Sequence, residues 1–169
     1  MVTIDLITGF LGSGKTTFLK KYAEYLMDQG LHIGILENDF GAINVDMLML
    51  HELRGDQCEL EMIAGGCDAE SHRRRFRTKL ISMRMCGYDR VLVEPSGIYD
   101  VDEFFDVLRE EPLDQWYEIG NVIAILDARL EKNLSQQADY LLASEAANAG
   151  KVILSHADAA TREQCEDTV

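Results

Sequence analysis

Residues 9–17 read GFLGSGKTT, a glycine-rich stretch whose residue types and spacing suit phosphate binding. It fits the pattern G-x-x-x-x-G-K-[ST], with Gly9, Gly14, Lys15 and Thr16 in the fixed positions. The glycines let the backbone close around phosphate groups, and the helix expected after the loop adds the positive end of its dipole. We expect Lys15 to reach the β- and γ-phosphates and the Thr16 hydroxyl to bind Mg²⁺. The predicted nucleotide-binding residues of the loop are Gly12, Ser13, Gly14, Lys15, Thr16 and Thr17.

Two acidic segments follow apolar runs further along the chain: ENDFG, which begins at Glu37, and EPSG, which begins at Glu94. A Mg²⁺-dependent nucleotide hydrolase needs one acid to hold the metal and another polar group to orient the attacking water. We expect Glu94 to hold the metal, because a carboxylate that ends a buried strand needs a partner. The backbone N–H of Gly97 would sense the γ-phosphate. Glu37 or Asp39 would complete the metal shell or lie near the water, although both residues also suit a turn-capping role. The residues predicted to act in catalysis are Lys15, Asp39 and Glu94.

Short apolar runs alternate with helix-like segments, and together they predict the scaffold that positions these groups. The runs are nearly continuous in Val, Ile and Leu, as in strands that are buried on both faces. They lie at 2–8, 32–37, 90–94, 121–127 and 151–155, and the helical patterns lie at 14–30, 70–87 and 135–150. This alternation predicts an α/β fold, a doubly wound and mostly parallel sheet flanked by helices. Residues 58–64 are compatible with an extra strand, and an antiparallel pairing near 47–50 is one arrangement that the pattern allows.

The composition limits the classes of function. A formal net charge of −14 on 169 residues argues against general binding to nucleic acid or an anionic membrane, but a local pocket for a nucleotide can still be positive. The N-terminus has no basic segment typical of a signal peptide, and no apolar run approaches the roughly 20 residues that span a bilayer. The four cysteines form no recognisable disulfide framework, so we expect free thiols in a reducing cytoplasm.

Six pieces of the chain, taken in order, resemble one known family. They are TGFLGSGKTT, ILENDFG, AGGC, VLVEPSG, AILDA and VILSHAD, and they extend over nearly the whole sequence. In these residues the chain resembles the CobW-type GTPases, metallochaperone P-loop proteins related to HypB and UreG. The resemblance implies a domain that binds GTP or GDP with Mg²⁺ and hydrolyses GTP slowly. It also implies a role in supplying zinc, cobalt or nickel to a client metalloprotein.

The cysteine content departs from the family pattern. The family usually carries G-C-x-C-C after the glycine pair, whereas here Cys67 is followed by Asp68 and Ala69. Glu37 matches a family metal-ligand position, so the resemblance implies a transition-metal site of Cys67 and Glu37, with His72 within reach. A closed tetrahedral site needs four ligands. We therefore expect either a weak or transfer site, or a site that has been lost.

The expected base-reading motif is also altered, because the family carries N-K-x-D where this chain has SHAD. The resemblance implies that Asp158 accepts hydrogen bonds from guanine, that His156 stacks on the base, and that Ser155 lacks the usual amide contact. We thus expect a weakened preference for GTP, with Asp158 as a helix N-cap as the alternative. The chain ends eleven residues after Asp158, so we expect one nucleotide-binding domain over 1–169 without the family's usual C-terminal domain.

Two questions stay open at this stage. The same motifs suit a nucleotide-gated binding module with little catalysis, and the phosphate-binding loop also occurs in small-molecule kinases. The basic run at 71–79 suits either an acidic partner or a solvated helix face. We favour the solvated face, with Phe76 turned to the core.

Overall fold

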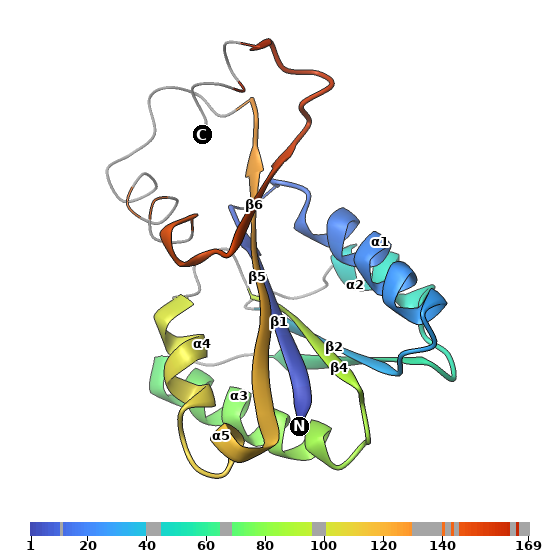
Figure 1. Cartoon of the computed structure of the whole chain (residues 1–169), viewed down its shortest axis with the longest axis vertical. Helices are drawn as coiled ribbons and strands as arrows, with labels where there is room; N and C mark the ends of the chain where they lie inside the picture. The colour runs from blue at the N-terminus through green and yellow to red at the C-terminus, as the bar shows by residue number, and fades with distance from the viewer. Residues whose placement is uncertain are drawn as a thin grey trace.

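The computed structural model describes the parts of the chain that form the sheet and most of its helices. The described residues are 1–10, 12–39, 45–64, 69–95, 101–129, 140, 143, 146–162 and 165, with backbone alone at 38, 39, 45–47, 64 and 69. In chain order the elements are β1 (Val2–Gly9), α1 (Lys15–Asp28), β2 (Ile33–Asp39), α2 (Val45–His51), β3 (Cys58–Ala64), α3 (Ala69–Arg84), β4 (Arg90–Glu94), α4 (Val101–Leu108), α5 (Leu113–Trp116), β5 (Tyr117–Asp127) and β6 (Lys151–Ser155). Figure 1 shows their arrangement.

These strands form one parallel sheet in the order β3-β2-β4-β1-β5-β6. Helices α1 and α2 cover one face, while α3, α4 and α5 cover the other (Figure 1). The predicted doubly wound α/β fold is therefore confirmed. In such a sheet all strands end at the same edge, which is where ligands bind.

The segment 58–64 is the clearest difference from the sequence prediction. It forms β3, which pairs in parallel with β2 from Ile33↔Cys58 to Asp39↔Ala64. The antiparallel pairing near 47–50 is wrong, because those residues lie in α2. Helix α2 provides the crossover that a parallel pair of strands needs.

Strand β5 begins at Tyr117, earlier than the predicted start at 121, and its register against β1 shifts between Ile4 and Leu6. The irregularity lies opposite Asp5, a fully buried carboxylate in β1. The Asn121 N–H donates to Asp5 Oδ1 at 2.6 Å, and a Cβ on Gly120 would lie 2.2 Å from the same oxygen. Gly120 therefore leaves room for the Asp5 carboxylate, and Asn121 belongs to the buried network around it.

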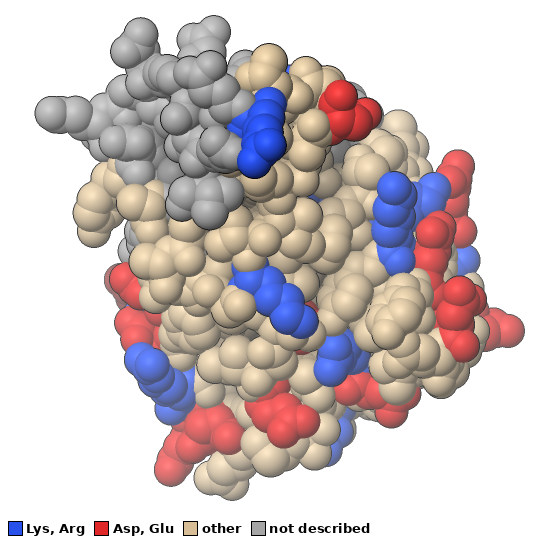
Figure 2. All heavy atoms as spheres, turned by 45° about the horizontal axis from the view of Figure 1, so that its top comes forward, with Lys and Arg blue, Asp and Glu red and all other residues tan. Residues whose placement is uncertain are grey.

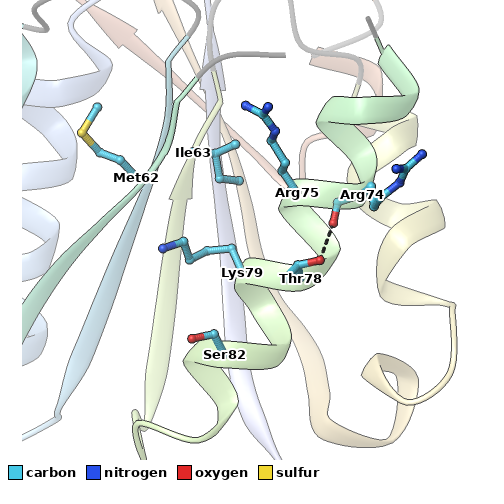
Figure 3. A pocket seen from close by; sticks show the side chains of 7 residues that line it. All are labelled: Met62, Ile63, Arg74, Arg75, Thr78, Lys79 and Ser82. Carbon is cyan, nitrogen blue, oxygen red and sulfur yellow. Dashed lines mark hydrogen bonds between the residues drawn. The ribbon is translucent and has the colours of Figure 1, made fainter. Parts of the chain in front are cut away.

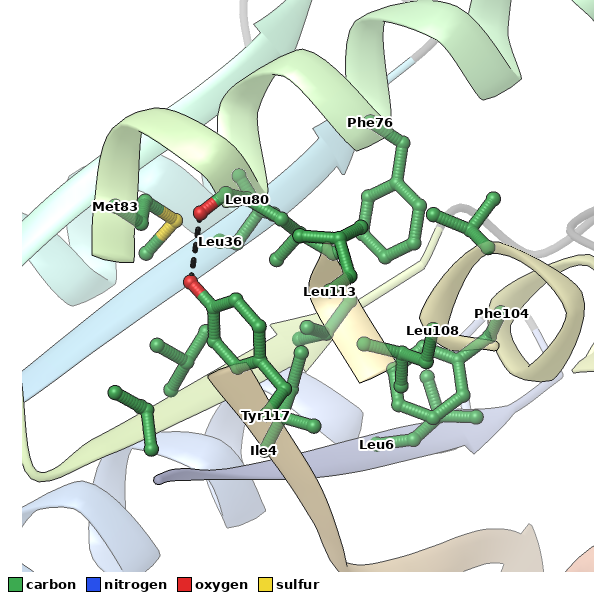
Figure 4. Close-up of a cluster of buried hydrophobic side chains, with 14 of the residues drawn as sticks. Ile4, Leu6, Leu36, Phe76, Leu80, Met83, Phe104, Leu108, Leu113 and Tyr117 are labelled. Carbon is green, nitrogen blue, oxygen red and sulfur yellow. Dashed lines mark hydrogen bonds between the residues drawn. The ribbon is translucent and has the colours of Figure 1, made fainter. Parts of the chain in front are cut away.

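The core has one apolar layer on each face of the sheet. Successive residues of a strand face opposite sides, so Leu36 packs in the layer with α3, and its neighbour Ile35 in the layer with α1. Figure 4 shows the α3 side, where Phe76 packs among residues from the strands and α4. The Tyr117 hydroxyl reaches across this layer and donates to the Leu80 carbonyl at 2.7 Å.

The first two predicted helices are confirmed. Helix α1 ends before Gly30, at φ 82°, and α3 ends before Gly87, at φ 79°. Most of the third, at 135–150, lies outside the described residues, although residues 140, 143 and 146–148 are helical. Among the helices that the structure describes, none is long and apolar enough to cross a membrane.

The surplus of acidic residues does not form one continuous patch on the face that Figure 2 presents. In that view the top of Figure 1, toward which β6 points, comes forward. Acidic and basic side chains lie next to one another along the lower and right margins, and the middle is mostly uncharged (Figure 2). A net charge of −14 is therefore compatible with a site on this side that accepts an anion.

Candidate nucleotide-binding site

The loop between β1 and α1 has the backbone conformation that its glycines predict. Gly9, Gly12 and Gly14 have φ of 144°, 79° and 90°, values that side chains with a Cβ rarely adopt. A Cβ on Gly9 would also lie 2.3 Å from the carbonyl oxygen of Ile125 in β5. Gly14 is the left-handed residue just before α1, so the positive end of that helix opens onto the loop.

Lys15 is buried, although it carries a charge, and it lies within the loop. Its Nζ donates hydrogen bonds to the carbonyl oxygens of Gly9 at 2.9 Å and Phe10 at 3.1 Å. The loop thus holds an ammonium group at the first turn of α1, which gives an acidic protein a local positive site. The neighbouring Gly12 and Thr17 are exposed.

Thr16 and Glu94 meet at the edge where the strands end. The Thr16 hydroxyl donates to Glu94 Oε1 at 3.0 Å, and both residues are buried. Glu37 is also buried and stands directly opposite Glu94 in the register of β2 and β4. A hydroxyl and carboxylates are the oxygen ligands that Mg²⁺ prefers, so this donor set fits the ion.

Ser13, inside the loop, also has a side chain that suits phosphate binding. Its hydroxyl is buried, and within the described part of the chain it has no hydrogen-bond partner. A buried hydroxyl without a partner is costly, and such groups are concentrated at sites that bind a polar ligand. The Ser13 hydroxyl is therefore a candidate phosphate-binding donor.

Three of the predicted site residues lie wholly or partly outside the described part of the chain. Cys67 and Gly97 lie outside the described residues, and so does the side chain of Asp39, whose backbone ends β2. His72 is described: it is buried in α3, and its Nδ1 lies 3.4 Å from Glu103 Oε1 of α4. In the described part of the chain, no group of three or more His, Cys, Asp or Glu side chains could hold a metal ion.

The SHAD segment lies beside the phosphate-binding loop, as the base-reading prediction requires. A Cβ on Gly14 would lie 3.8 Å from the Ser155 Cβ, and the Ser155 hydroxyl donates to the Leu126 carbonyl at 3.2 Å. His156 adopts a left-handed φ of 53° and begins a tight turn, in which the Ala159 N–H donates to its carbonyl at 3.0 Å. Asp158 lies in this turn with an exposed side chain.

The sequence did not lead us to two further residues at this edge, Asp127 and Arg129. Asp127 ends β5, and its Oδ2 lies 3.1 Å from His156 Nδ1. The Arg129 side chain donates to both Asp127 oxygens, at 3.1 and 2.9 Å. These hydrogen bonds are the main reason why the pKa of Asp127 falls to about 2. The signal in the sequence that could have indicated Asp127 was its position at the end of a buried strand, the same position that Glu94 has in β4.

The basic run of α3 is mostly a solvated face, as expected. Phe76 is fully buried in the core, and Arg73 and Arg77 both pair with Glu110, at 2.6 and 3.0 Å. These pairs connect α3 to the segment that follows α4. Arg74 and Arg75 are exposed on another side of the helix, where Arg74 lies 3.5 Å from Glu70.

Together, the glycine loop with its buried lysine and the Thr16–Glu94 pair place the chain among the P-loop nucleotide-binding proteins. The model of the CobW/HypB/UreG nucleotide-binding domain family matches residues 3–169, and the chain belongs to that family. The resemblance inferred from the six sequence pieces is therefore confirmed.

Two curated relatives are zinc chaperones of Escherichia coli (strain K12). The chain is 31% identical to YeiR over 157 residues, which cover 89% of this chain and 47% of YeiR. It is 29% identical to YjiA over 172 residues, which cover 94% of this chain and 50% of YjiA. The chain thus spans about half the length of the curated relatives it matches.

Solved structures show the same fold at lower identity. The signal recognition particle receptor FtsY from Elizabethkingia anophelis, in complex with GDP, matches with a TM-score of 0.65 at 17% identity, over 98% of this chain and 52% of that one. The Zn(II)-bound YjiA GTPase from E. coli matches with a TM-score of 0.59 at 21% identity, over 98% and 53%. At these identities the likeness shows the fold alone.

Proposed function

We propose that residues 1–169 form the GTP-binding domain of a metal chaperone or metal-insertion switch that hydrolyses GTP slowly and supplies zinc, cobalt or nickel. The observation that carries the nucleotide part is the Thr16–Glu94 hydrogen bond of 3.0 Å beside the buried ammonium of Lys15. The metal part is supported by family membership and by the two relatives named as zinc chaperones.

The loop binds the phosphates in this proposal, and residues at the ends of β2 and β4 bind Mg²⁺ or orient the attacking water. Lys15 and the backbone N–H groups of the loop bind the β- and γ-phosphates, and the Ser13 hydroxyl adds a donor. Thr16 and Glu94 hold Mg²⁺, which supplies charge neutralisation to the phosphate oxygens. Asp39 orients the attacking water or completes the metal shell, and the Gly97 N–H contacts the γ-phosphate.

Base selection is assigned to the SHAD segment. Asp158 accepts hydrogen bonds from guanine N1–H and the 2-amino group, His156 stacks on the base, and Ser155 stands beside the phosphate-binding loop. Calorimetric titration with GTP and with ATP in the presence of Mg²⁺ tests this assignment. We expect tighter binding of GTP, and a loss of that preference in Asp158→Ala. Equal affinity of the wild-type protein for the two nucleotides would exclude guanine selection.

The transition metal is the cargo, and Cys67 with Glu37 is the proposed transfer site. Zinc, cobalt and nickel titrations with and without a GTP analogue test it, with Cys67→Ala as the variant. Cys86→Ala is the matched control, because Cys86 is an exposed thiol beyond the end of α3. We expect weaker metal binding in Cys67→Ala alone. Unchanged affinity would remove Cys67 from the site.

Single-turnover measurements separate a slow GTPase from a binding module that only changes conformation. The GTPase predicts Mg²⁺-dependent phosphate release, which stops in Glu94→Gln. If GTP binds but no phosphate is released, even with zinc present, the module is the better description. Phosphate transfer to a small acceptor would instead identify a kinase.

A further inference from the structure

A groove of about 450 Å³ lies beside α3 and the carboxyl end of β3, where Met62 is the register partner of Glu37 (Figure 3). Its described lining combines basic, hydroxyl and apolar side chains. They are Met62 and Ile63 of β3, and Arg74, Arg75, Thr78, Lys79 and Ser82 of α3. The described lining thus includes three cationic side chains and no carboxylate, in a protein whose net charge is −14.

The groove lies along an open edge of the sheet. Strand β3 is the terminal strand, and in the described part of the chain no strand pairs with its outer side. Successive residues of a strand face opposite sides of the sheet, so Met62 and Ile63 line the groove from two faces. A groove that reaches both faces of an edge strand has the position that an added strand would occupy.

The backbone of β3 indicates which groups would pair with that added strand. The Gln57 carbonyl accepts from Ile33 of β2 at 2.9 Å, so residue 57 points inward. Cys58 points the other way and exchanges two hydrogen bonds with Gly55, at 3.0 and 3.3 Å. By the alternation of a strand, the backbone groups of Leu60 and Met62 also point outward.

The helix side of the groove provides the charges. Lys79 and Ser82 extend from α3 toward the strand that carries Ile63, and Arg75 lies one turn before Lys79 (Figure 3). The row from Arg74 to Ser82 is about 12 Å long at 1.5 Å per residue. That length corresponds to about four residues of extended chain.

Two of the three cations in the groove, Arg74 and Lys79, already pair with acids of this chain. Glu61 of β3 pairs with Lys79 at 2.8 Å, and Glu59 accepts a hydrogen bond from Tyr88. Glu70 lies 3.5 Å from Arg74 in an exposed pair. Exposed pairs of this kind contribute little and can exchange for a carboxylate of a partner.

We propose that this groove binds an extended acidic segment of a partner protein, which adds to the sheet beside β3 and places carboxylates against Arg75 and Lys79. Backbone hydrogen bonds to Leu60 and Met62 would give affinity, and the basic row of α3 would select acidic side chains. This docking does not depend on the proposed GTPase activity, because it uses no residue of the nucleotide site.

A phage-displayed library of random twelve-residue peptides, panned on the 169-residue protein, tests the proposal. We expect enriched peptides with Asp or Glu at alternate positions. A synthetic copy of the most enriched peptide, measured by fluorescence anisotropy, should bind Arg75→Glu at least 10-fold more weakly than wild type. Thr78→Trp, which fills the groove without changing its charge, should also weaken binding. The control Lys21→Glu makes the same charge change on exposed α1 and should bind normally.

Amide hydrogen exchange on the same complex identifies the mode of binding. We expect the N–H groups of Leu60 and Met62 to become protected, because an added strand pairs with them. The proposal is wrong if no peptide is enriched, if the enriched peptides lack acids, or if Arg75→Glu binds them as well as wild type does. Binding without protection of β3, or equal competition by inorganic phosphate, would identify a simple anion site instead.

Discussion

The two ends of the parallel sheet differ in whether buried side-chain oxygens of β1 and its loop have hydrogen-bond partners within the protein. Toward the amino end, Asp5 is fully buried, and its oxygens accept hydrogen bonds from the Tyr22 hydroxyl at 2.8 Å, from Arg90 at 3.0 Å and from the Asn121 N–H at 2.6 Å. At the carboxyl end, the hydroxyls of Thr8 and Ser13 are buried and have no hydrogen-bond partner among the described residues. Both hydroxyls belong to β1 or to the loop that follows it.

This difference separates stability from function along one strand. Donors from the protein itself satisfy the Asp5 network, so it can hold β1, β4 and β5 together with no ligand. The end of β1 and the loop after it instead have three glycines at positive φ, which lose more backbone entropy on folding than other residues, and a buried hydroxyl without a partner in the described part of the chain. Both features cost free energy in folding. Such costs are expected where binding a ligand repays them.

The largest effect should come from Asp5→Ala. The substitution leaves the Arg90 guanidinium and the Asn121 N–H without their carboxylate, which should lower the free energy of unfolding by about 3 kcal/mol. Urea unfolding measures this loss. GTP affinity at a temperature where the variant is folded should change less than about twofold, since Asp5 lies away from the loop. A large loss of GTP affinity in the folded variant would show that the Asp5 network also contributes to nucleotide binding.

Lys15→Ala should have the opposite profile. Loss of the ammonium removes charge-assisted hydrogen bonds to phosphate, so GTP affinity should fall roughly 100-fold. The free energy of unfolding should fall by only about 1 to 2 kcal/mol, the cost of losing two hydrogen bonds, one to the buried Gly9 carbonyl and one to the partly buried Phe10 carbonyl. Calorimetry and urea unfolding on the same sample provide both values. An equal loss of stability would mean that the loop is also a structural element.

The sequence predicted most of the fold because buried parallel strands are nearly continuous in apolar residues, as in RVLVE of β4. It allowed a strand at 58–64 but not the parallel pairing of β3 with β2, and in this strand Glu59 and Glu61 interrupt the apolar pattern. The partners of these acids, Tyr88 and Lys79, come from later parts of the chain, so nothing within the segment indicated its place in the sheet. The early start of β5 was missed for the same reason.

The phosphate-binding loop was predictable because all its determinants lie within nine consecutive residues. The contacts of Asp127 with Arg129 and His156 were not, because β6 brings residue 156 back beside the end of β5 only in the folded sheet. Register between strands cannot be read from one sequence. The Thr16–Glu94 pair was anticipated only because both residues belong to recognisable motifs.

Arg129→Ala tests the electrostatics of the carboxyl end. The Arg129 hydrogen bonds are the largest cause of the low pKa of Asp127, about 2 against an ordinary 3.8. Because the folded pKa lies below the unfolded value, the ionised carboxylate stabilises the fold above about pH 4, and this contribution disappears as the pH falls to 2. Because solvent screens this exposed pair, we expect the variant to be less stable than wild type at pH 6 by much less than Asp5→Ala is.

The comparison of Arg129→Ala with wild type at pH 2 completes this test. There the difference in unfolding free energy should shrink, because Asp127 is becoming protonated in both proteins. An NMR titration of the Asp127 carboxyl should show its pKa moving up toward the ordinary value in the variant. A stability difference that stays constant from pH 6 to 2 would mean that Arg129 acts through packing rather than charge.

The smallest effect on stability, and the sharpest test of the contrast, is expected from Ser13→Ala. The substitution removes a buried hydroxyl that has no hydrogen-bond partner in the described part of the chain, so the free energy of unfolding should stay constant or rise by up to about 1 kcal/mol. GTP affinity should nevertheless fall by roughly 3- to 10-fold, if the hydroxyl donates to a phosphate.

The matched control is Thr3→Val toward the amino end, where the Thr3 hydroxyl donates to Glu118 at 2.9 Å in an exposed position. That variant should leave GTP affinity unchanged. If Ser13→Ala lowered stability and kept full affinity, the unpartnered hydroxyl would not be a cost of ligand binding, and the two ends of the sheet would not differ in the way we infer.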